Sequence, residues 1–331
     1  MNLDLKNKRI LVSGASGLIG TGLIKTLLGE GAKVRALVRN PSKTKSIQHQ
    51  NVEIKVIDFA YPATLQGVVQ NCQIVFHLAG ILNEFKSYSY YQQVNVMGTK
   101  VLAEQAIQVG VEKFIHTSTV WVHGMNITGL IDETSPQIRS GNFYADSKLE
   151  GEEIIRKFVQ DKKLPAVIVL PSQVYGPDDR TWTQRPLELI RDGRMILVDG
   201  GQGLMQPIYI DDLIRGILLA AKTGIIGQSY ILCGAKSITC REYFNLLADL
   251  VGKKKLPAVP KWVAVTMART AEYWAMITRS KPVFTCQEIQ ATTVQATYNG
   301  KKAREELGFE PKIDLNTGMA RIKQWIEAGR A

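Results

Sequence analysis

The chain has 331 residues and a formal net charge of +11, from 41 Lys and Arg against 30 Asp and Glu. Hydrophobic residues make up 45% of it, enough for a large core, which excludes a wholly disordered protein. Four scattered cysteines and the lack of a run of about 18 apolar residues exclude a disulfide scaffold and an ordinary membrane span, so we expect a reduced, cytoplasmic protein.

Short apolar runs alternate with longer helical patterns along the first half of the chain. Strands are predicted at Ile10–Val12, Val34–Val38, Val52–Ile57, Ile74–Leu78, Phe114–His116 and Val167–Leu170. Helices are predicted at Leu18–Leu28, Pro62–Val69, Tyr90–Val109 and Tyr144–Gln160. This alternation indicates βαβ units with right-handed crossovers, and therefore an α/β, Rossmann-type doubly wound parallel sheet.

The second half is less regular. Residues Gly176–Gln184 are rich in Gly, Pro, Asp and Arg and are predicted to form a loop. Two further strands, Ile208–Ile210 and Ser229–Leu232, flank a helix at Asp211–Lys222, and later helices are predicted at Cys240–Leu250, Trp262–Ile277, Gly300–Leu307 and Asn316–Glu327. We expect a dinucleotide-binding domain of residues 1–174, to which 205–232 return, and a smaller, mostly helical C-terminal substrate lobe of 175–204 and 233–331.

A glycine-rich loop follows the first strand and precedes the first helix. Gly14 allows a tight turn, Gly17 lets the backbone approach a pyrophosphate, and Gly20 lets the helix pack closely on the strand. The partial positive charge at the helix N-terminus favours phosphate. We therefore predict a dinucleotide site whose loop also includes Ser16, Leu18 and Ile19.

The second strand ends at Arg39, where a site for NAD usually carries an acidic residue. A guanidinium can bind a ribose 2′-phosphate through charge-assisted hydrogen bonds, and Lys43 follows closely. We therefore favour NADP(H) over NAD(H), against the alternative that Arg39 is a solvated surface charge.

Two further segments are expected at the cofactor. Asp58 could accept a hydrogen bond from the adenine amino group, with Phe59 supplying backbone contacts; as an alternative, Asp58 caps the helix near Pro62. Leu78, Ala79 and Gly80 end a strand with small residues and would let the backbone lie against the riboses.

Tyr144 and Lys148 share one face of a predicted helix, because they are four residues apart. A nearby ammonium favours the phenolate, so we expect Lys148 to lower the pKa of Tyr144 and to make it an acid/base near neutral pH. Thr119 leaves the strand Phe114–His116 at its C-terminal end, where ligands bind in such sheets, and could hold the substrate oxygen.

Taken in order, these motifs resemble the extended short-chain dehydrogenase/reductase superfamily, also called the NAD-dependent epimerase/dehydratase family. The resemblance spans nearly the whole chain and extends to Asn95–Thr99, Pro171–Pro177, Tyr209–Asp212 and Lys302–Gly308. It implies that Tyr144 is the catalytic acid/base, that Lys148 binds the nicotinamide ribose, and that Thr119 is the catalytic hydroxyl, with Ser118 as the alternative one residue away. We further assign Asn95, Thr117, Pro171 and Val174 to the cofactor, and Ile81, His123, Gln173, Gln206 and Tyr209 to the substrate.

Departures from the family pattern narrow the expected reaction. Val120 and Trp121 stand where related sugar-nucleotide 4,6-dehydratases carry an Asp-Glu pair, which argues against elimination of water. The segment that ends at Arg39 is more similar to that of the dihydroflavonol-reductase and 3β-hydroxysteroid-dehydrogenase-like branches. The leading hypothesis is an NADP(H)-dependent oxidoreductase that interconverts a secondary alcohol and a ketone or aldehyde on a small or medium organic substrate. The alternatives are a sugar-nucleotide epimerase with retained NAD(P) and a non-catalytic NAD(P)-binding regulator.

The remaining expectations concern partners. The four histidines are scattered, so no metal site is indicated, and no aromatic-rich basic motif supports nucleic-acid binding. The family resemblance suggests a homodimer through the helices Tyr90–Val109 and Tyr144–Gln160. The segment Lys261–Arg279 has a heavy apolar load; we expect it to pack against the lobe or a partner subunit, rather than to cover a substrate pocket or lie on a membrane surface.

Overall fold

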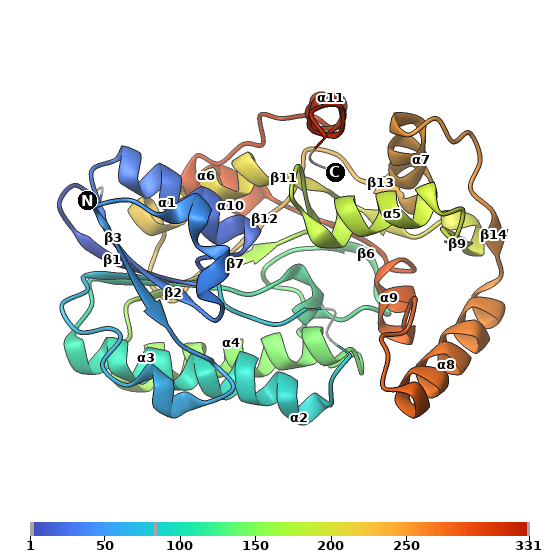
Figure 1. The fold of residues 1–331 in the computed structure, drawn as a ribbon. Helices are drawn as coiled ribbons and strands as arrows, with labels where there is room; N and C mark the ends of the chain where they lie inside the picture. Colours follow the sequence, from blue (N-terminus) through green and yellow to red (C-terminus); the bar gives the residue numbers. More distant parts are fainter. Residues whose placement is uncertain (1–2, 83–84, 330–331) are drawn as a thin grey trace.

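A seven-stranded, wholly parallel sheet forms the centre of the protein in the computed structural model, which describes residues 3–82 and 85–329 (Figure 1). Its spatial order is β12-β7-β5-β4-β1-β2-β3. The strands are β1 (Arg9–Ser13), β2 (Lys33–Val38), β3 (Val52–Val56), β4 (Ile74–His77), β5 (Lys113–Thr117), β7 (Ala166–Pro171) and β12 (Ser229–Leu232). The order reverses between β1 and β4, and ligands bind outside the carboxyl ends of the strands at such a switch point.

Helices cover both faces of this sheet, as expected for crossover connections (Figure 1). On one face lie α1 (Leu18–Gly29), α6 (Ile210–Thr223) and α10 (Lys301–Leu307), and on the other α2 (Tyr88–Tyr91), α3 (Gly98–Val109) and α4 (Phe143–Lys162). A π-helical segment, Gln92–Met97, joins α2 to α3, so the predicted helix Tyr90–Val109 is one run with a π-helical insertion. Such insertions occur frequently at functional sites.

The remaining elements form a second layer of structure beside the carboxyl ends of the strands. The short strands pair as β6 (Thr128–Ile131) with β15 (Gln295–Tyr298), β8 (Val174–Tyr175) with β11 (Ile208–Tyr209), β9 (Leu197–Val198) with β14 (Ala258–Val259), and β10 (Leu204–Met205) with β13 (Ile238–Thr239). The helices are α5 (Arg185–Arg191), α7 (Cys240–Leu250), α8 (Lys261–Thr278), α9 (Cys286–Ala291) and α11 (Leu315–Glu327). Of the returning segment 205–232, β12 joins the central sheet, whereas β11 pairs with β8 instead.

Two predicted elements are wrong. The helix expected at Pro62–Val69 is a 3₁₀ turn of Pro62–Leu65, because the Thr64 hydroxyl donates to the Asp58 and Tyr61 carbonyls and Gly67 turns the chain at φ +70°. The loop expected at Gly176–Gln184 contains a π-helical turn, Arg180–Gln184, which runs directly into α5. The Asp179 carboxylate caps this turn by accepting from the backbone N–H groups of residues 181 and 182, so polar residues that suggested a loop start a helix instead.

Candidate active site

The glycine loop between β1 and α1 packs too tightly for side chains at two of its glycines. Gly14 has φ +68°, and a Cβ placed there would lie 3.0 Å from the backbone nitrogen of Ala79. A Cβ on Gly20 would lie 2.3 Å from the Gly14 carbonyl oxygen. Gly17 is the N-cap of α1 and offers no side-chain acceptor, so the first N–H groups of the helix remain free for an anion.

A buried hydrogen-bond chain fixes the strand ends beside this loop. The Ser13 hydroxyl accepts from the two backbone N–H groups that follow β4 and lies 2.8 Å from Nδ1 of His77. Nε2 of His77 lies 2.8 Å from the Thr99 hydroxyl, which donates to the Asn95 carbonyl. Burial holds the pKa of His77 well below its usual value, so the ring is neutral and joins β1 and β4 to the π-helical segment.

Asn95 connects the cofactor side of the site to the catalytic helix. Its Oδ1 accepts from the Ile81 N–H at 2.9 Å, and its Nδ2 donates to the Ser147 hydroxyl on α4 at 2.9 Å. A Cβ on Gly80 would lie 3.3 Å from Asn95 Oδ1 and 3.9 Å from Lys148 Nζ. Asn95 therefore positions the segment after β4 and does not line the cavity, although it was assigned to the cofactor.

The residues expected to be catalytic come together near the start of α4. Asn142 caps this helix by accepting from the Ala145 N–H at 3.1 Å, which places Tyr144 in the first turn and Lys148 one turn later. Both side chains line one cavity together with Thr119, which follows β5. The Tyr144 ring meets the Trp121 ring edge to face, with centroids 6.0 Å apart.

The charges in this cavity differ from the sequence-based expectation. Burial raises the pKa of Tyr144 to about 12, and hydrogen bonding with Thr119 offsets this only in part. Burial lowers the pKa of Lys148 to about 8, against the attraction of Glu152 on the next turn. The expected lowering of the Tyr144 pKa by Lys148 is therefore wrong for the protein without its cofactor, because desolvation of the phenolate outweighs the neighbouring interactions.

Most predicted site residues line a single cavity of about 310 Å³ at the carboxyl ends of β1, β4, β5 and β7. The structure brings together Gly14, Gly17, Leu18, Ile19, Gly20, Leu78, Gly80, Thr117, Thr119, Tyr144, Lys148, Pro171, Gln173 and Val174. Segments separated by more than 150 residues thus meet where the topology places a ligand.

Four residues assigned to the substrate are not among those that line this cavity. Gln206 uses both ends of its amide internally, donating to the Gly234 carbonyl at 2.9 Å and accepting from the Tyr298 N–H at 2.8 Å. Tyr209 packs edge to face on Tyr175. Nδ1 of His123 lies 3.0 Å from a carbonyl oxygen of the 135–136 turn, and the Ile81 N–H is bound by Asn95 as described above.

The residues expected at the adenosine end lie outside the cavity. Arg39 is exposed at the end of β2, next to the glycine loop, and no carboxylate of the described residues pairs with it. Lys43 is exposed on the turn that follows. Ser16 and Ala79 belong to segments that flank the cavity. Asp58 accepts from the Ala60 N–H at 2.9 Å, which resembles the capping alternative, and the buried Phe59 ring stacks on His77.

Sequence reasoning missed one wall of the cavity. Trp121 and Trp182 pack edge to face with centroids 6.2 Å apart, and Asp179, Thr181, Ser172 and Leu82 complete this side. Trp182 is the only aromatic residue in the stretch predicted to be a loop, and an aromatic residue among turn formers was the available signal. Burial raises the pKa of Asp179 to about 6, against the backbone N–H groups that it caps.

The cavity fits a ligand rich in hydrogen-bonding groups. Four buried polar atoms on its wall have no partner among the described residues: Thr117 Oγ1, Ser118 Oγ, Trp121 Nε1 and Gln173 Nε2. Buried polar groups are nearly always paired, so these atoms and the free N–H groups of α1 suit the pyrophosphate, ribose and amide groups of a dinucleotide together with a polar group on the substrate.

Fold and site together define an NAD(P)-dependent oxidoreductase of the extended short-chain dehydrogenase/reductase type. The profile of the NAD dependent epimerase/dehydratase family matches residues 10–233, and the chain belongs to this family.

Comparisons with individual proteins agree over nearly the whole chain. A 4-hydroxy-2-methyl-3-oxo-4-farnesyl-3,4-dihydroquinoline-1-oxide ketoreductase from Stigmatella aurantiaca is 26% identical over 328 residues, covering 97% of this chain and 98% of that protein. A 3 beta-hydroxysteroid dehydrogenase/Delta 5-->4-isomerase from Mycobacterium tuberculosis (strain ATCC 25618 / H37Rv) is 26% identical over 330 residues, covering 92% and 86%. The solved dTDP-glucose 4,6-dehydratase DesIV from Streptomyces venezuelae superposes with a TM-score of 0.81 over 97% of this chain and 98% of that chain; at 22% identity it supports the fold alone.

Proposed function

We propose that the protein is an NADP(H)-dependent oxidoreductase that interconverts a secondary alcohol and a ketone on an apolar organic substrate. The observation that carries this proposal is the meeting of Tyr144 and Thr119, with Lys148 beside them, in the same cavity as the glycine loop. When bound, the nicotinamide exchanges a hydride with the substrate carbon.

The residues of this chain supply position and a proton. Thr119 holds the substrate oxygen next to Tyr144, and the phenol donates its proton to that oxygen as the carbonyl becomes an alcohol; in the reverse direction Tyr144 takes the proton back. A Tyr144 pKa of about 12 keeps the phenol protonated at neutral pH, which suits carbonyl reduction. Lys148 lies beside Gly80 and would hold the ribose of the cofactor.

Support for an apolar substrate comes from the wall of the cavity and from the relatives. The walls beside Tyr144 are Trp121, Trp182 and Leu82. Relatives of similar identity are a ketoreductase of a farnesyl dihydroquinoline oxide, a 3β-hydroxysteroid dehydrogenase and, in Stenotrophomonas maltophilia, a 2-alkyl-3-oxoalkanoate reductase. Support for NADP(H) is the unpaired Arg39 at the end of β2.

The proposal is tested by Tyr144→Phe combined with a screen of apolar ketones, in which oxidation of NADPH and of NADH is followed in parallel. We expect turnover to fall by a factor of about 10²–10⁴, because proton transfer is lost while the ring is kept. NADPH binding, measured by fluorescence, should be unchanged, and Tyr61→Phe at an exposed position is the matched control. Unchanged turnover in Tyr144→Phe would remove this residue from the mechanism.

A sugar-nucleotide epimerase is the second candidate, because Arg180, Arg185 and Arg194 line a cleft beside the cavity and could meet a diphosphate. Glu188 pairs with both Arg180 and Arg185, and Asp192 lies 3.7 Å from Arg194, so these charges are already partly compensated. Tightly retained nucleotide in the ultraviolet spectrum of the purified protein would favour the epimerase.

A further inference from the structure

Helix α8 is attached to the protein through alanines. Ala264, Ala268 and Ala275 are its buried residues, and Ala264 and Ala268 pack with Val198 and Ile289 in a small separate core. On a helix with 100° per residue these three alanines form one narrow stripe. The fully buried residues of α8 are therefore all small, and of its larger side chains Val265 packs partly buried against the same core.

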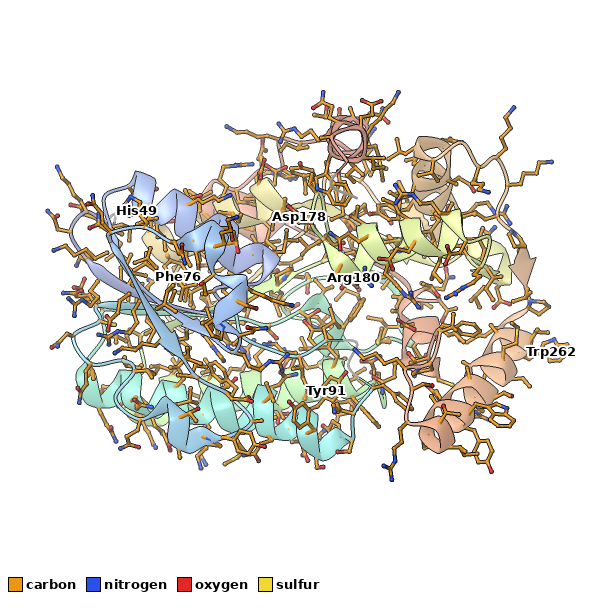
Figure 2. All side chains as sticks on the ribbon, viewed as in Figure 1. His49, Phe76, Tyr91, Asp178, Arg180 and Trp262 are labelled. Carbon is orange, nitrogen blue, oxygen red and sulfur yellow. The ribbon has the colours of Figure 1, made fainter. Side chains whose placement is uncertain are left out.

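The outward face of α8 is aromatic and apolar, so only part of its apolar load packs against the lobe. Trp262 is 72% exposed, and Figure 2 shows it at the edge of the molecule, pointing away from the body. Tyr273, Trp274, Ile277 and Met267 are exposed on the same side. At 100° per residue no charged side chain falls between them, whereas a surface helix of a water-soluble domain usually turns its charged face outward.

The threonine hydroxyls of this face are satisfied within the helix. The hydroxyls of Thr266, Thr270 and Thr278 each donate to the backbone carbonyl four residues earlier, at 2.8–2.9 Å. Their methyl groups complete the apolar surface, and none of the three hydroxyls needs water as an acceptor. The face can therefore enter an apolar medium without leaving these groups unpaired.

Basic residues precede, interrupt and follow α8 in the chain, and three of them, Lys261, Arg269 and Lys281, line the cleft on its other side. Between residues 253 and 281 the chain has seven basic side chains and one acidic one, Glu272. The seven are exposed and have no ion-pair partner in the described parts of the chain: Lys253, Lys254, Lys255, Lys261, Arg269, Arg279 and Lys281. The segment that precedes α8 lies at the same end of the molecule as the helix (Figure 1).

We propose that α8 docks this protein onto the surface of an anionic lipid bilayer. The helix lies in the plane of the interface, with Trp262, Trp274 and Ile277 between the acyl chains and headgroups and the flanking lysines and arginines on anionic headgroups. No helix within residues 3–82 and 85–329 is long and apolar enough to cross a membrane, so the attachment is peripheral. A second copy of the chain fits less well, because a symmetric contact through α8 brings two of these basic segments together.

Vesicle sedimentation of the full chain tests this proposal. We expect binding to vesicles of phosphatidylcholine with phosphatidylserine, weaker binding to phosphatidylcholine alone, and release as salt is raised. The double variant Trp262→Ala/Trp274→Ala should lower the partition coefficient about tenfold or more, because two exposed aromatic anchors are lost. Tyr61→Ala, which removes an aromatic side chain 67% exposed elsewhere, should bind as the unmodified protein does.

The assay does not depend on enzymatic activity, so its outcome is independent of the proposed reaction. Unchanged thermal unfolding of the double variant verifies that the loss of binding is local, since both tryptophans are exposed. Failure of the unmodified protein to sediment with anionic vesicles would overturn the proposal, and so would equal sedimentation of the double variant. A dimer that becomes a monomer in the double variant, without vesicle binding, would assign the face to a second copy and would also overturn it.

Discussion

Lys148 is 3% exposed, and burial of its ammonium group opposes folding of the protein. Burial lowers its pKa from 10.5 to about 8, and this net shift already includes the attraction of Glu152. At 1.36 kcal/mol per pKa unit, the charged form of the side chain costs about 3 kcal/mol of folding free energy at neutral pH. We therefore expect Lys148→Met, which keeps the length and removes the charge, to raise the free energy of unfolding by up to about 3 kcal/mol at pH 7.

The measurement is the thermal and denaturant unfolding of the cofactor-free protein. With an unfolding entropy of about 2.1 cal/mol/K per residue, such a gain raises Tm by about 4 °C. The gain should shrink as pH rises from 8 to 10.5, because in this window the unfolded chain binds more protons at Lys148 than the folded protein does, and the unmodified protein recovers its stability. Catalytic turnover should fall in the same variant.

Lys157→Met is the matched control, since Lys157 is exposed on the same helix α4 and should change stability little. A gain in Lys148→Met that grows with pH would refute the reasoning, as would an equal gain in the control. A loss of stability at pH 7 would mean that the attraction between Lys148 and Glu152 stabilises the fold by more than desolvation of the Lys148 ammonium costs.

Two further predictions concern the cofactor site. Gly20→Ala should lower the free energy of unfolding by about 1–3 kcal/mol, because the new methyl group would lie 2.3 Å from the Gly14 carbonyl oxygen. Gly17→Ala should fold normally in circular dichroism and raise the cofactor Kd about tenfold, since its Cβ meets only that carbonyl, at 3.2 Å, and Gly17 lines the cavity. A larger loss of stability in Gly17→Ala, or a larger loss of cofactor binding in Gly20→Ala, would contradict this. Arg39→Ser should weaken NADPH binding about 10- to 100-fold in titration calorimetry and leave NADH unchanged, with Lys45→Ser as the control; equal losses for both cofactors would refute a 2′-phosphate contact.

The glycine loop illustrates what could be predicted from local sequence. A strand, three glycines at fixed spacing and a helix restrict the local backbone, so the loop and its place at a strand end were correct, and the flanking strand and helix extend only one residue beyond the predicted ends. Tyr144 and Lys148 line one cavity for a similar local reason, because a four-residue spacing on a helix brings two side chains to one face wherever the helix lies.

Burial, in contrast, depends on segments far apart in the chain. The pKa of Tyr144 is raised because distant walls remove its water, and neither the spacing to Lys148 nor any local pattern contains that information. Gln206 was assigned to the substrate, but its amide is hydrogen-bonded to the backbone of Gly234 and Tyr298, which are distant in the sequence. Trp182 lines the cavity because residues 180–184 form a helical turn, although their composition is typical of a loop.

The order of elements, the parallel sheet and the residues of the catalytic helix follow from the sequence by itself, because each rests on hydrogen bonding and periodicity between near neighbours. Tertiary packing alone decided which of those residues face one cavity and which of them lose their water there. It also decided that α8 turns tryptophans rather than charged side chains outward. Solvent exposure is a property of the assembled surface, and an apolar helix has the same sequence whether its large side chains enter the core or leave it.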